Sequence, residues 1–210
     1  MPLFKTIAVN SQTTVKIWKI TESFEDLKRK VRLNPENEQR VSGMKSEIHQ
    51  RGFLSVRCLL QSFDYSDADL YYDNFGKPHL KDGTYISVTH SFQFSAVILS
   101  NEPVGIDLEK QRPKIALIAH KFIDYEFDYL KENDSDYIKN LTVLWCIKEA
   151  LYKLYATPGL SFKNHCLVIP FSYDEDDTTA WIDFENSKRK YRAHRLEFEG
   201  FTCAYALQHN

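Results

Sequence analysis

Two acidic residues, Asp107 and Glu109, lie two positions apart in the run VGIDLE (104–109), which has the composition of a β-strand. Side chains alternate between the two faces of a strand, so these carboxylates point the same way. Adjacent carboxylates repel each other unless they share a proton or a cation. A hard divalent cation such as magnesium suits this oxygen-rich arrangement. Gly105 would let another group approach the strand backbone closely. Taken alone, the run favours the simpler interpretation of two solvated surface acids.

A second group of charged residues lies in the run WCIKEALYK (145–153), inside a strongly amphipathic stretch. Glu149 and Lys153 are four residues apart and share one face of the predicted helix. An ordinary surface ion pair explains this spacing. The alternative is a third metal-binding carboxylate beside a lysine that contacts phosphate.

Two short segments earlier in the chain could also bind a ligand. In the run VTHS (88–91), His90 is flanked by two hydroxyl side chains at a strand end, where loops commonly build sites. In the run GKP (76–78), Lys77 would place a cation on a rigid turn. A single histidine is more often structural than a ligand, and many turns have the composition of the second run.

These four runs must be positioned by regular elements, which the pattern of apolar residues and turn residues predicts. Strands are expected at 4–9, 13–19, 84–89, 94–100, 103–109, 165–170, 179–185, 190–198 and 200–207. Helices are expected at about 24–31, 36–61, 115–131 and 136–156, with an irregular segment at 62–83. Asn101 and Glu102 occupy the place of a hairpin turn.

This order of elements predicts an α+β fold in two parts. Each half contains strands and a long helix, and the halves meet near residue 104. We therefore expect an N-terminal half at 1–104 and a C-terminal half at 105–210, packed around a central cleft. Clefts of this kind are preferred ligand sites, so the active site is expected between the halves.

Taken together, the runs GKP, THS, VGIDLE and WCIKEALYK occur in the order and approximate spacing of one enzyme family. The chain resembles the 4'-phosphopantetheinyl transferases over residues 76–163, and its length resembles the pseudodimeric, surfactin-synthetase-activating type. The pair of motifs G-I-D-x-E and W-x-x-K-E-A-x-x-K is specific at this separation. The resemblance implies a pseudodimeric fold and transfer of 4'-phosphopantetheine from coenzyme A to a serine of an acyl or peptidyl carrier protein.

The resemblance also assigns roles to individual residues. Asp107, Glu109 and Glu149 match magnesium ligands, and Lys153 matches a lysine that contacts coenzyme A phosphate. Lys77 and His90, with Thr89 before it, match residues near the adenosine 3'-phosphate. Glu126 matches a glutamate considered as a catalytic base, a role for which Glu149 is the other candidate. Lys148 is placed to support the phosphates.

The resemblance is thinner in the N-terminal part. Thr89 replaces the usual serine before the histidine, a change that keeps the hydroxyl group. The basic residues that would hold the 3'-phosphate cannot be aligned there. The candidates are Arg40, Lys45 and Arg51.

The composition excludes other classes of function. The net charge of -2 provides no general attraction to nucleic acid or to anionic lipid. No apolar run is long enough for a membrane span, no signal peptide is recognisable, and the four cysteines form no CxxC pair, so we expect a cytoplasmic protein with free thiols. The resemblance, with its two-half arrangement, implies a monomer. Carrier proteins are commonly acidic, and the basic cluster at 28–32 is one candidate surface for them.

A non-catalytic module that binds coenzyme A or a carrier protein is the alternative function. Such a module would be expected to have lost part of the catalytic set. All three carboxylates and Lys153 are present, which favours the enzyme.

Overall fold

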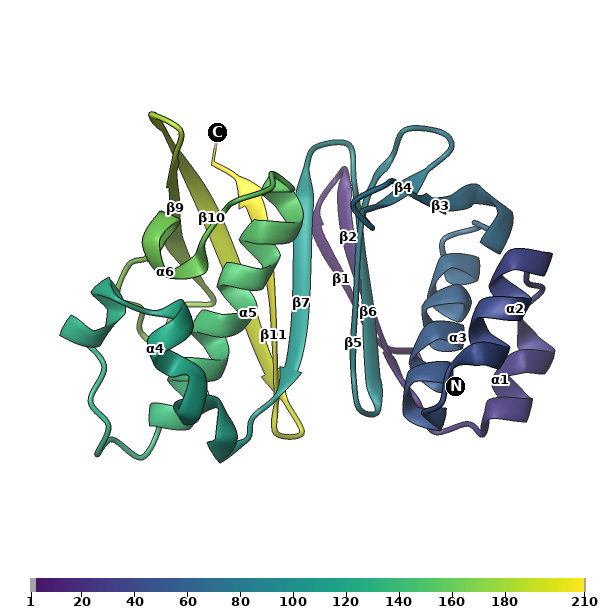
Figure 1. Ribbon diagram of the computed structural model, residues 1–210, viewed down its shortest axis with the longest axis horizontal. Coiled ribbons are helices and arrows are strands. Elements are labelled where there is room, and N and C mark those ends of the chain that lie inside the picture. The colour runs from purple at the N-terminus through teal and green to yellow at the C-terminus, as the bar shows by residue number, and fades with distance from the viewer. Residues whose placement is uncertain (1–2, 210) are drawn as a thin grey trace. The chain divides into compact units, whose positions relative to one another are not determined.

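The structure is a computed structural model that describes residues 3–209. The chain divides between Asn101 and Glu102 into two compact units, called unit 1 and unit 2 below (Figure 1). Both contain helices packed against antiparallel strands, which confirms the α+β class. Asn101 and Glu102 do not form the predicted hairpin turn, because both edges of the strand before them are already paired within unit 1 and the strand after them joins the sheet of unit 2.

Unit 1 is built on a four-stranded antiparallel sheet in the order β1-β2-β6-β5. Its strands are β1 (Leu3–Asn10), β2 (Thr13–Lys19), β5 (Tyr85–Ser91) and β6 (Phe94–Ser100). β6 is buried along its whole length, as expected for an inner strand rich in Ala, Val, Ile and Leu. The sequence predicts these four strands to within two residues, because their β-branched runs are bounded by turn residues.

Unit 1 also contains three α-helices (Figure 1): α1 (Phe24–Lys30), α2 (Pro35–Gly43) and α3 (Glu47–Ser62). Ser23 caps α1 by accepting a hydrogen bond from the backbone N–H of Asp26. The single helix expected at 36–61 is wrong: α2 ends at Gly43, and α3 begins after Ser46. Glycine is a poor helix former, and the interruption lets the two helices pack separately against the core.

The segment expected to be irregular at 62–83 contains a small hairpin. A 3₁₀ turn, η1 (Asp67–Asp69), leads into β3 (Leu70–Tyr72), which pairs with β4 (Pro78–Leu80). Strands of three residues are too short to show a clear alternation of apolar and polar positions, so the sequence pattern did not reveal them.

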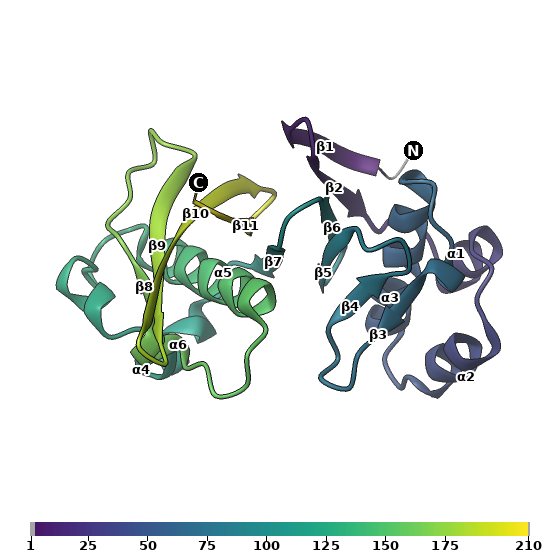
Figure 2. The ribbon, with the colours of Figure 1, turned by 90° about the horizontal axis from the view of Figure 1, so that it is seen from above.

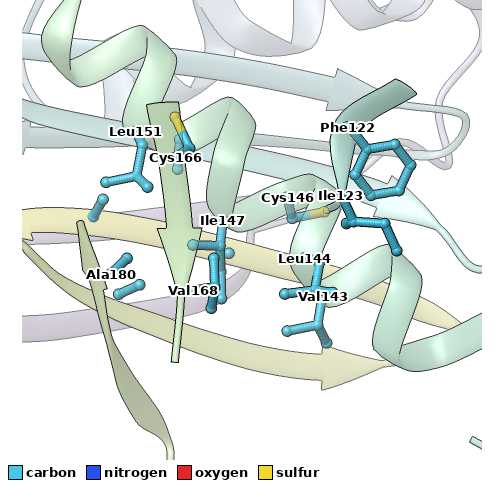
Figure 3. Close-up of a cluster of buried hydrophobic side chains, with 14 of the residues drawn as sticks. Phe122, Ile123, Val143, Leu144, Cys146, Ile147, Leu151, Cys166, Val168 and Ala180 are labelled. Atoms are coloured by element: carbon cyan, nitrogen blue, oxygen red, sulfur yellow. The ribbon is translucent and has the colours of Figure 1, made fainter. Parts of the chain in front are cut away.

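Unit 2 is built on a five-stranded antiparallel sheet in the order β7-β11-β10-β9-β8. Its strands are β7 (Val104–Lys110), β8 (Cys166–Val168), β9 (Asp177–Phe184), β10 (Ser187–Phe198) and β11 (Phe201–Gln208). The long helix α5 (Tyr137–Tyr155) packs across β7 and β11 (Figures 1 and 2). Its buried face supplies Val143, Leu144 and Ile147 to the core of this unit (Figure 3).

The single helix expected at about 115–131 is instead a series of three short helices. They are η2 (Pro113–Ile118), α4 (Ala119–Phe122) and η3 (Tyr125–Asp128). A fourth short helix, α6 (Phe162–His165), precedes β8. Ile123, between α4 and η3, has an extended backbone and a fully buried side chain, so packing against the core interrupts the helix there.

All four cysteines are buried free thiols, as predicted. Within residues 3–209, no helix is both long and apolar enough to cross a membrane.

Candidate functional site

The candidate site of unit 2 is built where helix α5 touches strand β7. A methyl group added to Gly105 would lie 1.8 Å from the carbonyl oxygen of Ala150 and 2.9 Å from the backbone N of Leu154. Only glycine permits this approach, because any side chain would overlap the helix backbone. The expectation that Gly105 admits a close neighbour is therefore confirmed, and that neighbour is α5.

Strand β7 carries the first two predicted carboxylates on one face. Asp107 is paired in register with Ala204 of β11, and Glu109 is paired with Thr202. Asp107 is buried, with 6% of its surface exposed, while Glu109 is partly exposed near the strand end. The site therefore has a buried carboxylate and a more accessible one.

Helix α5 brings Glu149 and Lys153 toward the same strand. The Lys153 ammonium donates to a carboxylate oxygen of Asp107 at 2.7 Å and to the carbonyl oxygen of Ile106 at 3.0 Å. Burial opposes the charge on Lys153, but the charge and hydrogen bond of Asp107, together with the charge of Glu149, outweigh burial and raise the pKa of Lys153. The lysine is therefore held protonated within the carboxylate group.

Glu149 shows the electrostatic imbalance of the site. Burial raises its pKa to about 7, and the negative charges of Asp107 and Glu109 contribute to the rise, while Lys153 opposes it. The pKa of Glu149 thus shows that the three carboxylates interact. A single lysine does not offset their combined charge, so this arrangement would be stabilised by an added cation or a retained proton.

The donor set fits magnesium in its chemistry. Three carboxylates supply the hard oxygen ligands that Mg²⁺ takes in proteins. In the described residues, however, no three His, Cys, Asp or Glu side chains form a group already arranged to hold a metal ion. Lys153 also engages one oxygen of Asp107. Binding a metal here would therefore require side chains of the site to turn.

Glu126 and Lys148 lie together in unit 2, in a buried ion pair with 2.8 Å between the Lys148 ammonium and a carboxylate oxygen of Glu126. Both side chains are almost completely buried, at 1% and 0% exposed. No sequence pattern indicates this pair, because its partners are 22 residues apart and lie in different elements.

The remaining predicted ligand residues lie in unit 1. His90 is an exposed residue of β5, and its ring covers Gly52 of α3, where an added methyl group would lie 3.0 Å from the ring. Thr89 beside it is buried. Lys77 precedes β4 in the small hairpin, and partial burial lowers its pKa. Gly52 has no recognisable signal in the sequence, because its role depends on a strand 38 residues later.

The three uncertain basic candidates of unit 1 have different environments. The Arg40 guanidinium lies over the rings of Phe53 and Tyr72, at 5.6 and 5.3 Å from their centroids. Arg51 donates to the carbonyl oxygen of Ile20 at 3.2 Å. Lys45 is exposed between α2 and α3.

The basic cluster at 28–32 is largely neutralised by nearby acids. Lys28 pairs with Glu38 at 3.4 Å, Lys30 pairs with Glu22 at 2.6 Å, and Arg29 pairs with Asp26. Exposed ion pairs of this kind are typical of a solvated face. This local compensation weakens the cluster as an attractive surface for an acidic partner.

Comparison with known proteins supports the resemblance carried by the motifs. Residues 103–206 match a family model described as the 4'-phosphopantetheinyl transferase superfamily. The chain is 26% identical over 135 residues to the 4'-phosphopantetheinyl transferase gsp of Aneurinibacillus migulanus, covering 63% of this chain and 55% of the relative. It is 28% identical over 121 residues to the 4'-phosphopantetheinyl transferase Sfp of Bacillus subtilis (strain 168), covering 52% and 53%.

The matched segment of the family model lies inside unit 2 and contains all the candidate residues of that unit. The chain spans about half the length of the curated relatives it matches. The family model and the relatives lead to the same assignment: residues 103–206, which contain the α5–β7 site, belong to the 4'-phosphopantetheinyl transferase superfamily.

Proposed function

We propose that this protein transfers the 4'-phosphopantetheine group from coenzyme A to a serine hydroxyl of an acyl or peptidyl carrier protein, with magnesium. The observation that carries the proposal is the carboxylate group of unit 2. Burial, with the negative charges of Asp107 and Glu109, raises the pKa of Glu149, and Lys153 donates a hydrogen bond to Asp107 beside it. This combination suits a pyrophosphate substrate that arrives with a divalent cation.

In this proposal Asp107, Glu109 and Glu149 would hold the magnesium ion. When bound, the ion would neutralise charge on the pyrophosphate of coenzyme A. Lys153 donates one hydrogen bond to Asp107 and one to the Ile106 carbonyl, so its third N–H can donate a hydrogen bond to a phosphate oxygen. Lys153 would thereby offset the charge that develops on the leaving phosphate.

The transfer forms one bond and breaks one. The serine oxygen bonds to the phosphorus that carries pantetheine, and the pyrophosphate bond to that phosphorus breaks. Adenosine 3',5'-bisphosphate leaves with the electron pair, and the serine proton passes to a carboxylate. We favour Glu149 over Glu126 for this role, because the Glu126 side chain is 1% exposed and is already paired with Lys148.

The residues of unit 1 complete the proposal. Lys77, His90 and Thr89 would bind the adenosine 3'-phosphate, with Arg40, Lys45 and Arg51 as additional candidates. The carrier class, a cytoplasmic location and a monomeric state are parts of the proposal that follow from the family resemblance.

The alternative, a module that binds coenzyme A without reaction, is tested by product release. We expect magnesium-dependent release of adenosine 3',5'-bisphosphate from coenzyme A when an apo-carrier protein is present. We expect Asp107→Ala to reduce this release by at least about 10³-fold, because the variant loses a metal ligand and the partner of Lys153. Coenzyme A binding, measured by calorimetry, without any release in the wild-type protein would favour the binding module. A folded Asp107→Ala variant with full activity would refute the metal assignment.

A further inference from the structure

The buried ion pair of unit 2 has a partner for every proton of its ammonium group. The Lys148 ammonium has three protons, and three acceptors surround it. They are a Glu126 carboxylate oxygen at 2.8 Å, the Phe122 carbonyl oxygen at 2.8 Å and the Phe162 carbonyl oxygen at 3.2 Å. With no exposed surface and every proton engaged, Lys148 cannot reach a phosphate in this arrangement.

Glu126 is engaged on both carboxylate oxygens. The oxygen that faces Lys148 also accepts a hydrogen bond from the backbone N–H of Val168 in β8 at 3.0 Å. The other oxygen accepts from the backbone N–H of Asp124 at 3.3 Å. Glu126 is therefore placed as a structural acceptor, and a serine hydroxyl of a carrier protein has no access to it because its side chain is 1% exposed.

The position of the pair along α5 gives it a further consequence. Lys148, Glu149 and Ala150 are consecutive. The Ala150 carbonyl lies against Gly105 of β7, and Lys148 binds α4, η3 and α6. The contacts at Lys148 and at Ala150 lie on different sides of the helix. Together they fix how the helix is rotated about its axis and where it lies along that axis, at the residue between them. That residue is Glu149.

We propose that Lys148 and Glu126 are a positioning pair, which holds α5 so that Glu149 faces Asp107, and that neither residue takes part in bond formation. This inference rests on the proposed function, because it concerns how the carboxylate site is held. It replaces the roles of phosphate contact for Lys148 and catalytic base for Glu126. Groups that orient metal ligands from behind are characteristic of metal sites, and their loss typically weakens metal binding about 10- to 100-fold.

The test uses the full-length protein and two variants, with the rate of transfer measured across a range of Mg²⁺ concentrations. Glu126→Gln keeps an oxygen acceptor for Lys148 and for Val168 but cannot act as a base. If Glu126 only positions the helix, we expect this variant to retain the wild-type maximal rate within about tenfold. If Glu126 were the general base, its loss would lower the rate about 10²- to 10⁴-fold. Lys148→Met combined with Glu126→Gln leaves no charge buried. We expect that double variant to need about 10- to 100-fold more Mg²⁺ for half of its maximal rate.

The matched control is the other deeply buried ion pair, Arg57 with Asp67 in unit 1, in which both side chains are 2% exposed and 3.0 Å apart. Replacing it by Arg57→Met with Asp67→Asn also removes a buried pair, so we expect a similar loss of thermal stability with an unchanged Mg²⁺ requirement. A 10²-fold or greater loss of maximal rate in Glu126→Gln, with an unchanged Mg²⁺ requirement, would overturn the proposal and make Glu126 the base.

Further outcomes separate the two proposals. An equal rise in the Mg²⁺ requirement in the Arg57 control would also overturn the positioning role, since any loss of stability would then produce it. A wild-type protein that transfers nothing to any carrier would instead refute the proposed function. If the Lys148 variant does not fold, Glu126→Gln alone decides, because it removes the base and keeps the oxygen acceptor.

Discussion

Both burial and repulsion from neighbouring carboxylates act on the carboxyl group of Glu149. This carboxyl is partly buried, and two further carboxylates lie on β7, so burial and the negative charge of Asp107 and Glu109 raise its pKa to about 7. Lys153 opposes this rise and does not cancel it. In the absence of a cation, ionised Glu149 is therefore a source of instability at neutral and alkaline pH.

The first prediction concerns stability without metal. The pKa of Glu149 in the folded protein, about 7, exceeds its ordinary value of 4.5, so the folded protein binds this proton more tightly than the unfolded chain. The contribution of Glu149 to the free energy of unfolding therefore falls as the pH rises from 4.5 to about 7, and stays low above pH 7. We expect Glu149→Gln to have a free energy of unfolding about 1 to 3 kcal/mol higher than the wild type at pH 8 in chelator. Urea unfolding measures this difference.

The comparison at low pH is the internal control. Near pH 4.5 the carboxyl of Glu149 is protonated in the folded protein, so the advantage of Glu149→Gln should shrink. Glu132→Gln removes an exposed glutamate and should change stability by less than about 0.5 kcal/mol at either pH. A Glu149→Gln variant that is no more stable than the wild type at pH 8 would show that the carboxylates do not repel each other in the folded protein.

At the scale of elements, the site depends on one contact between α5 and β7. The approach at Gly105 brings the helix backbone within reach of the strand, and the separation of only 1.8 Å between an added methyl carbon and the Ala150 carbonyl oxygen shows how little space remains. We expect Gly105→Ala to push the two elements apart. The Lys153–Asp107 hydrogen bond and the position of Glu149 would both change, because these groups lie on the elements that separate.

The second prediction follows from this contact. Gly105→Ala should lower the free energy of unfolding by about 3 kcal/mol or more, since overpacking against a backbone carbonyl has no flexible side chain to absorb it. Activity should fall more than about tenfold even where the variant remains folded, because misplacement by about 1 Å is costly in catalysis. Chemical unfolding and initial rates at one temperature measure the two effects.

Gly43→Ala is the matched control for this substitution. Gly43 is the last residue of α2, and a methyl group added there meets no atom within 4 Å. Alanine should be neutral or stabilising at this position, by up to about 1 kcal/mol. Equal losses in the two variants would contradict the close-approach role of Gly105.

The strand and helix that carry the site could be predicted from the sequence, whereas the contacts that hold them in place could not. β7 and α5 were recognised to within a residue or two, because the run VGIDLE alternates and the helix containing Glu149 has a long apolar stripe. The break between α2 and α3 and the short turns at 113–128 were not recognised, because tertiary packing decides them. Contacts such as Lys148 with Glu126 join distant segments and leave no periodic pattern.

At the scale of the whole molecule, each unit has its own hydrophobic core. The core of unit 1 forms around Leu54, Leu59 and Leu60 of α3, and the core of unit 2 forms around Leu144, Ile147 and Leu151 of α5. The proposed function requires His90 of unit 1 to contact the 3'-phosphate of coenzyme A.

The third prediction tests that requirement. His90→Ala should raise the KM for coenzyme A about tenfold or more with little change in kcat, because a hydrogen bond to a charged phosphate contributes about 1.5 to 3 kcal/mol. With 3'-dephospho-coenzyme A as substrate, wild type and variant should become equal. His49→Ala, which removes a ring whose centroid lies 6.3 Å from that of His90, is the control. A penalty that persists with the dephosphorylated substrate would contradict the assigned contact.

The central claim is tested most directly by the intact mass of the carrier. A panel of apo-carrier proteins would be incubated with the wild-type protein, coenzyme A and Mg²⁺, with a parallel series in chelator. We predict a gain of one phosphopantetheine on at least one carrier, at its serine, and no gain in chelator. Coenzyme A binding with no mass gain on any carrier, or a gain of equal rate in chelator, would contradict the account of unit 2 as a magnesium-dependent transfer site.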